Sequence, residues 1–172
     1  DRRNLRRAMA LLDEAGWEVG DDGLRRNAEG QTLRVEFLNA GPLFNRIINP
    51  YVENLRSIGV DAELITVDGA QLRQRQNEAD FDIITDHFSF GYEPSSGLRQ
   101  SFGTLGAEQP LFNSMGLADP AVDELIETVI RAETRDEMIT AARALDRVLR
   151  AMVVRVGQWY NDAHWVSYYD MY

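Results

Sequence analysis

One unit of this sequence constrains the fold more than any other: a strand pattern, a long helix pattern and a second strand pattern separated by short connections. Apolar residues alternate with charged ones over 33–37, which predicts a half-buried strand. Apolar residues at helical spacing then run over 44–58 and stop at Gly59, a residue suited to end a helix. Alternation resumes over 60–64. This order predicts a βαβ unit with two parallel strands and a right-handed crossover.

Helix and turn signals on both sides extend this unit. Capping patterns of a polar residue followed by an acid or glutamine mark several helix starts. Together the patterns predict an α/β fold with a mixed sheet flanked by helices. The predicted elements are a helix over 5–15, turns at 21–23 and 27–30, a helix over 68–77, a strand over 81–85, a helix starting at Asp119, a helix from Thr134 to about 152, and strand patterns over 153–160 and 164–169.

The segment 89–117 shows no sustained period and is rich in glycine, serine, proline and aromatic residues. A loop of this length inside a compact domain is usually functional or mobile. Within it, Asn113 is interpreted as a side chain that stabilises the loop.

Composition excludes several classes of function. The chain of 172 residues contains no cysteine, so disulfides, thiolate metal sites and cysteine nucleophiles are excluded. A formal net charge of −10 argues against nucleic acid as a partner, because such a surface repels phosphate backbones. No apolar run approaches the ~20 residues that span a bilayer.

The best candidate site follows the strand predicted over 81–85. In open α/β sheets, ligands bind beyond the carboxyl ends of the strands. Aromatic side chains there offer apolar contact that tolerates varied ligands, and polar groups can hold a peptide backbone. Phe88 and Phe90 share one face of an extended chain, so they could equally belong to the core. The candidate residues are Asp86, His87, Phe88, Ser89, Phe90, Tyr92 and Glu93.

Catalysis and metal binding are not predicted at this place. Asp86 and His87 are adjacent and therefore point to opposite faces of a strand. Ser89 lacks the surrounding Gly-x-Ser-x-Gly elbow of a hydrolase. No spacing such as His-Glu-x-x-His supports a metal site. We therefore predict a binding function without cofactor.

Four segments resemble, in their order and spacing, the C-terminal lobe of the oligopeptide-binding class of bacterial extracellular solute-binding proteins, family 5. Within this class the chain is most similar to the YejA-like peptide-binding branch, where Pro94, Arg99 and Gly103 match the loop after the strand. The four segments are LLDEAGW at 11–17, YVENLRSIGVDA at 51–62, ADFDI at 79–83 and DPAVDELI at 119–126.

The resemblance implies a periplasmic-binding-protein-like II architecture with two lobes and a ligand cleft between them. Residues 1–152 would form the second lobe, and 153–172 would return toward the N-terminal lobe of the same protein. The ligand would be a peptide or peptide-like solute, and the partners would be the transmembrane subunits of an ABC permease. The location would be the periplasm, or the cell surface as a lipoprotein. Arg99 and Trp159 join the expected ligand-binding residues, with packing between the lobes as the other role open to Trp159.

Two departures from the family pattern limit this expectation. Many relatives hold the peptide ammonium with an aspartate, but the matching place here, Phe90 or Gly91, carries no acid. An Asn-Glu pair of the branch is replaced by Ser96-Gly97. A non-peptide solute, such as a nickel complex or a glycoside, and an interaction or dimerisation module without a small ligand therefore remain the alternatives.

Overall fold

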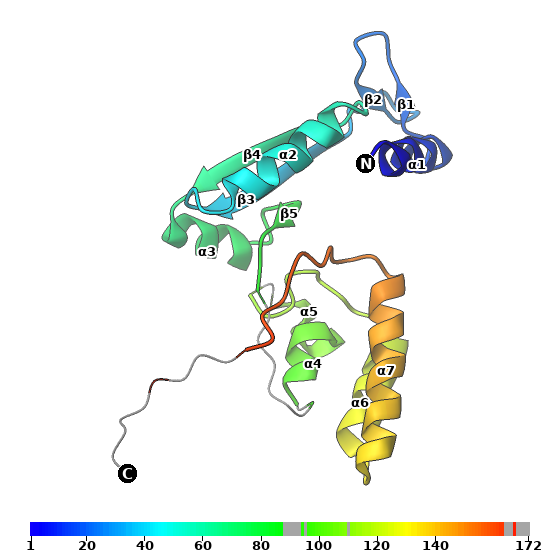
Figure 1. The fold of residues 1–172 in the computed structure, drawn as a ribbon, viewed down its shortest axis with the longest axis vertical. Helices are drawn as coiled ribbons and strands as arrows, with labels where there is room; N and C mark the ends of the chain where they lie inside the picture. Colours follow the sequence, from blue (N-terminus) through cyan, green and yellow to red (C-terminus); the bar gives the residue numbers. More distant parts are fainter. Residues whose placement is uncertain (88–93, 95, 110, 164–166, 168–172) are drawn as a thin grey trace.

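The structure, a computed structural model, describes residues 1–87, 94, 96–109, 111–163 and 167, which form two parts with separate hydrophobic cores (Figure 1). The first part holds α1 (Arg2–Glu14), β1 (Glu18–Val19), β2 (Arg25–Arg26), β3 (Arg34–Ala40), α2 (Asn45–Arg56), β4 (Asp61–Val67), α3 (Gly69–Asn77) and β5 (Ile83–Ile84). The second part holds α4 (Gly97–Phe102), α5 (Thr104–Ala107), α6 (Pro120–Arg131) and α7 (Arg135–Ala151).

The predicted βαβ unit is confirmed. Strands β3 and β4 pair in parallel over their whole length, from Arg34 opposite Asp61 to Ala40 opposite Val67, and α2 connects them. Strand β5 pairs in parallel with the other edge of β3, giving the order β4-β3-β5. The carboxyl ends of all three strands therefore meet at one edge of the sheet, which we call the carboxyl edge.

The predicted α/β class is confirmed. Among the described residues, the parallel pairs and the antiparallel pair lie in two separate sheets. The antiparallel pair is the short hairpin of β1 and β2. Gly23 turns this hairpin with a φ of +80°, a conformation that favours glycine. The hairpin is fastened to the rest by Arg25, which is only 1% exposed.

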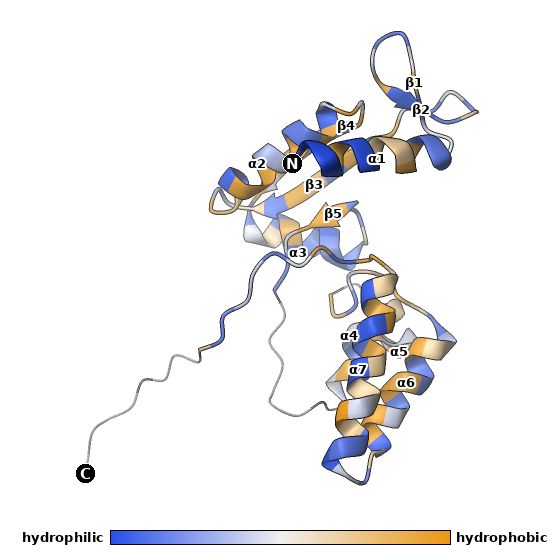
Figure 2. Cartoon of the chain, turned by 45° about the vertical axis from the view of Figure 1, so that its right-hand side comes forward, coloured by the Kyte–Doolittle hydropathy of each residue, from blue (hydrophilic) through white to orange (hydrophobic). Residues whose placement is uncertain are grey.

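Helices α1 and α2 cover one face of the parallel sheet. Phe37 of β3 and Ala62 of β4 are buried against Val52 of α2. The apolar stripe of α1 packs against the same cluster, as the predicted helix over 5–15 requires. This helix begins earlier than predicted, at Arg2, because the Asp1 side chain caps it by accepting from the Arg3 amide. Figure 2 shows the hydrophobic colouring of β3 and β5 in this part.

Helix α3 covers the opposite face and fixes the start of β5. Its predicted capping box between Asp68 and Gln71 is confirmed. Arg75 of α3 forms ion pairs with Glu36 at 2.6 Å and with Asp80 at 2.7 Å. Because successive strand residues point to opposite faces, Glu36 faces α3, whereas the next residue of β3, Phe37, faces α2. Strand β5 is shorter than the strand predicted over 81–85.

The second part is a helical hairpin of α6 and α7 with two short helices packed against it. Val122 and Ile126 of α6 are buried against Leu145 of α7. The predicted starts of both helices are confirmed, since Asp119 caps α6 and a Thr134 capping box begins α7. Helices α4 and α5, in contrast, were not predicted. Four to six residues are too few to display a helical period.

The strand predicted over 153–160 is not formed. Residues 153–163 are described, and they contain neither helix nor strand. Extended chain becomes a strand only when a neighbouring strand supplies hydrogen bonds, and among the residues that the structure describes no strand pairs with 153–160. Apart from residue 167, the strand pattern predicted over 164–169 lies outside the described residues. Among the described residues, no helix combines the length and the apolar character needed to cross a membrane.

Candidate functional site

The candidate site lies at the carboxyl edge, where the sequence analysis placed it. Asp86 and His87 follow β5, and both are exposed. The His87 backbone amide donates to the Asp86 Oδ1 at 2.8 Å, and this hydrogen bond holds the Asp86 carboxylate against the adjacent backbone. Phe88, Ser89, Phe90, Tyr92 and Glu93 lie outside the described residues, so their roles stay predictions.

A polar network holds together the loops of the other two strands at this edge. Asn39, 4% exposed at the end of β3, donates from Nδ2 to the Gly41 carbonyl oxygen at 2.9 Å and to the Asn45 Oδ1 at 3.1 Å. Asn45 in turn donates to the Thr66 hydroxyl oxygen of β4 at 3.3 Å. The first turn of α2 is thereby tied to two strand ends. The sequence analysis missed these residues, although an asparagine closing an apolar strand was a signal for them.

The segment after α7 returns to this edge and brings Trp159 with it. The Trp159 ring lies 5.9 Å from the Phe44 ring, centroid to centroid, at an interplanar angle of 31°. Phe44 directly precedes α2 and had been interpreted as part of the helical core stripe. Trp159 remains 62% exposed, so most of this indole faces solvent beside the carboxyl edge. The structure thus places Trp159 against Phe44 at the start of α2, and its predicted ligand-binding role stays a prediction.

Arg155 lies on the same segment, between the carboxyl edge and the helical part. Its guanidinium carbon is 5.3 Å from the Phe102 ring centroid, and Nη2 donates to the Met115 sulfur at 3.7 Å. Desolvation lowers the pKa of Arg155, while the negative charge of Asp86 acts in the opposite direction. The sequence analysis missed Arg155 because the segment was interpreted as a strand. A lone arginine among valines was the available signal.

Arg99 lies away from the carboxyl edge, in the helical part. Its Nε and Nη2 donate to the two carboxylate oxygens of Glu127 at 2.5 and 2.9 Å, a forked ion pair that joins α4 to α6. The hydrogen bond from Arg99 lowers the pKa of Glu127. This pair has an evident structural role, and the ligand-binding role predicted for Arg99 stays a prediction.

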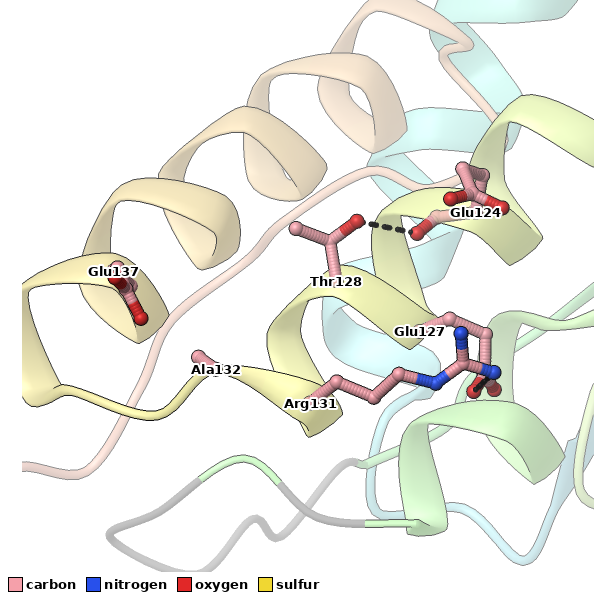
Figure 3. A pocket seen from close by; sticks show the side chains of 6 residues that line it. All are labelled: Glu124, Glu127, Thr128, Arg131, Ala132 and Glu137. Atoms are coloured by element: carbon pink, nitrogen blue, oxygen red, sulfur yellow. Dashed lines mark hydrogen bonds and ion pairs between the residues drawn. The ribbon is translucent and has the colours of Figure 1, made fainter.

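A hollow of about 330 Å³ lies elsewhere, between the C-terminal half of α6 and the start of α7 (Figure 3). It contains no residue predicted from the sequence as part of the site, and its groups are engaged with one another: Arg131 pairs with Glu127, and the Thr128 hydroxyl donates to the Glu124 carbonyl oxygen. Among the residues that the structure describes, no group of three or more acidic or histidine side chains could hold a metal ion. The hollow is lined by Glu124, Glu127, Thr128, Arg131, Ala132 and Glu137.

Asn113 has the loop-stabilising role that was predicted for it. Its side chain is fully buried. Nδ2 donates to the Leu117 carbonyl oxygen at 2.8 Å and to the Gly103 carbonyl oxygen at 3.3 Å, and Oδ1 accepts from the Leu117 amide. It therefore organises the chain between α4 and α6 and does not belong to the candidate site.

Comparisons with known proteins agree with the architecture. A sequence profile described as "Bacterial extracellular solute-binding proteins, family 5 Middle" matches residues 1–109. The chain is 38% identical over 170 residues to the "Probable peptide-binding protein YejA" of Agrobacterium fabrum, covering 98% of this chain and 28% of that protein. The chain therefore spans little more than a quarter of this relative's length.

Two solved structures show the same fold at low sequence identity. The oligopeptide-binding protein AppA from Bacillus subtilis, in complex with a nonapeptide, is 17% identical with a TM-score of 0.71, covering 84% of this chain and 29% of that chain. A periplasmic oligopeptide-binding protein from Thermotoga maritima with bound mannohexaose is 20% identical with a TM-score of 0.74, covering 91% of this chain and 31% of that chain.

Proposed function

Because this chain belongs to the bacterial extracellular solute-binding proteins of family 5, we propose that it forms one wall of a groove that binds peptides or peptide-like solutes. The protein acts as the substrate-binding component of an ABC importer, in the periplasm or at the cell surface. One observation carries the proposal: the three parallel strands end at one edge, with Asp86 in the turn after β5 and the exposed Trp159 ring on Phe44 in the connection from β3 to α2.

The chemistry of this edge suits a peptide. The exposed face of Trp159 offers apolar contact that does not depend on one particular side chain. The Asp86 carboxylate accepts hydrogen bonds, as peptide N–H groups or a terminal ammonium require. These are binding groups, and the proposed role is not catalytic.

The proposed mechanism is closure of two lobes around the ligand. Residues 1–152 form one lobe, the segment 153–172 runs toward a second lobe, and the ligand makes contacts with both that exist only in the closed state. A closed, loaded protein then docks on the transmembrane subunits of the permease. Because one wall supplies only part of the contacts, the chain of 172 residues alone should bind peptide weakly or not at all.

Isothermal titration of a defined tetrapeptide pool into the full-length natural protein tests the proposal. Asp86→Asn should weaken binding roughly three- to tenfold, as expected for one charge-assisted hydrogen bond that stays partly screened by water. Asp21→Asn is the matched control, because this exposed aspartate lies in the turn of the β1–β2 hairpin and not at the carboxyl edge. Equal effects of the two substitutions, or tight binding by the 172-residue chain alone, would contradict the proposal.

Two further titrations separate the alternatives. Mannohexaose and a nickel–histidine complex represent glycosides and metal complexes, which are different classes of solute. Binding of either one in the absence of peptide binding would replace the peptide assignment. No binding of any solute, together with a concentration-dependent dimer in analytical ultracentrifugation, would favour an interaction module.

A further inference from the structure

The two parts of this chain have separate cores, so something other than shared core packing must set their spacing. Neither hydrophobic cluster contains a residue of the other part. Figure 1 shows the segment after α7 crossing the space between β5 and the short helices α4 and α5. This segment makes side-chain contacts with both parts, to Phe44 of the first and to Phe102 of the second.

Arg155 anchors the segment to the helical part. The guanidinium lies over the face of Phe102, which is buried in the helical core, and it also contacts the Met115 sulfur. A planar cation over an aromatic face is attracted by the ring quadrupole, more strongly when water is partly removed. Partial desolvation is also what lowers the pKa of Arg155.

Trp159 anchors the same segment to the sheet part. Its partner Phe44 is packed against the core formed by α1, α2 and the sheet, so the ring is a firm platform. The two contacts mark the anchors, and burial does not, since Trp159 is 62% exposed and Val156 of the same segment is 60% exposed. The segment is thus solvent-exposed, with a ring contact at Trp159 and a cation–ring contact at Arg155.

We propose that residues 153–160 are a two-point clasp, in which Arg155 holds the helical part and Trp159 holds the sheet part. The clasp sets the spacing between the carboxyl edge and helices α4 and α5. Arg155 and Trp159 both belong to an exposed segment outside the two hydrophobic clusters, so the clasp can open without unfolding either core. Its consequence for ligand binding rests on the proposed function, since the clasp crosses the edge at which the ligand is proposed to bind.

Distance measurements between spin labels test the clasp directly. The chain has no cysteine, so Asn54→Cys on α2 and Arg143→Cys on α7, both exposed, give one label on each part. Pulsed electron paramagnetic resonance on the labelled chain, without any ligand, should give one narrow distance. Arg155→Ala and Trp159→Ala should each abolish this narrow distance. Phe44→Leu should do the same from the opposite side of the contact.

Two variants of the same segment serve as controls. Val156→Ala and Tyr160→Ala remove comparable side chains that lie outside the two anchor contacts, and the narrow distance should persist in both. A broad distribution in the unsubstituted chain, an unchanged distance in Arg155→Ala and Trp159→Ala, or equal broadening in the controls would overturn the clasp.

The absence of ligand keeps this test separate from that of the proposed function. If the distance does not respond to the anchor substitutions, the clasp fails while peptide binding still stands on its own titration. If the distance responds but no peptide binds to the full-length protein, the proposed function fails and the clasp remains as a structural device.

Discussion

Replacing Arg25 by methionine is a stringent test of how the hairpin of β1 and β2 is held to the sheet part. Arg25 is 1% exposed. Its Nε donates to the Ile58 carbonyl oxygen at 2.7 Å, and its Nη1 donates to the Trp17 carbonyl oxygen at 2.5 Å and to the Asp13 Oδ1 at 2.6 Å. One guanidinium therefore joins the end of α1, the hairpin and the connection from α2 to β4.

The expected loss follows from these three contacts. Methionine fills much of the space of the aliphatic stem, so the main loss is that of charged donors to two backbone carbonyls. Hydrogen bonds to charged groups contribute about 1.5–3 kcal/mol each. Asp13 is 61% exposed, so its ion pair adds little. Relief of the cost of burying a cation offsets part of the loss. The net expectation for Arg25→Met is about 2–4 kcal/mol of lost stability.

Urea unfolding followed by circular dichroism measures the loss, and hydrogen exchange locates it. The amide of residue 25, which donates to the Gly59 carbonyl oxygen, and the Leu33 amide, which donates to the carbonyl oxygen of residue 25, should lose protection first. Arg26→Met is the matched control, because Arg26 pairs at the surface with Asp22 and should matter little. A loss below about 1 kcal/mol for Arg25→Met, or an equal loss in the control, would refute the reasoning.

Two further predictions concern the helical part. Gly106→Ala should destabilise this part by about 1–3 kcal/mol in thermal unfolding, because a Cβ there would lie 2.0 Å from the Gln100 carbonyl oxygen. Gly157→Ala is the neutral control, because a Cβ at residue 157 would meet no non-neighbouring atom within 4 Å. Equal melting temperatures of the two variants would contradict the steric argument. Arg99→Gln should raise the pKa of Glu127, followed by carbon NMR of its carboxyl group. Because the pKa of Glu127 is lowered in the folded state, the stability that this pair contributes is present above the unfolded-state pKa and is lost as pH falls through the folded-state pKa. An unchanged pKa of Glu127 in Arg99→Gln would contradict the assigned pair.

The parts of the fold that could be predicted are those fixed by local chemistry. The capping boxes at Asp68 and Thr134 involve residues three positions apart, so they can be recognised without knowing the fold. The parallel pairing of β3 and β4 followed from a helix placed between two strands, since a crossover leaves little choice of topology. Each of these signals is contained in a short, continuous piece of sequence.

The parts that could not be predicted depend on contacts between distant residues. Helix α5 approaches α4 closely only because Gly106 has no side chain, and nothing in the surrounding sequence reveals that approach. The segment after α7 has the composition of a strand, but its conformation depends on whether a partner strand is available. Nothing in the sequence distinguishes Arg25 from the many exposed arginines, although the folded chain buries its side chain.

The same division explains why the position of the site was easier to predict than its chemistry. Parallel strands oblige their carboxyl ends to share an edge, so the turn after β5 had to lie beside the ends of β3 and β4. The aromatic group on Phe44 and the cation whose charge interacts with Asp86, however, come from Trp159 and Arg155, which follow α7 much later in the chain. Topology alone therefore locates the edge, whereas its binding properties depend on how a separate segment is anchored across it. Under the proposed function, Arg155→Ala and Trp159→Ala should consequently change the ligand preference of the full-length protein in titration without changing the fold of the sheet, whereas Val156→Ala should leave both unchanged.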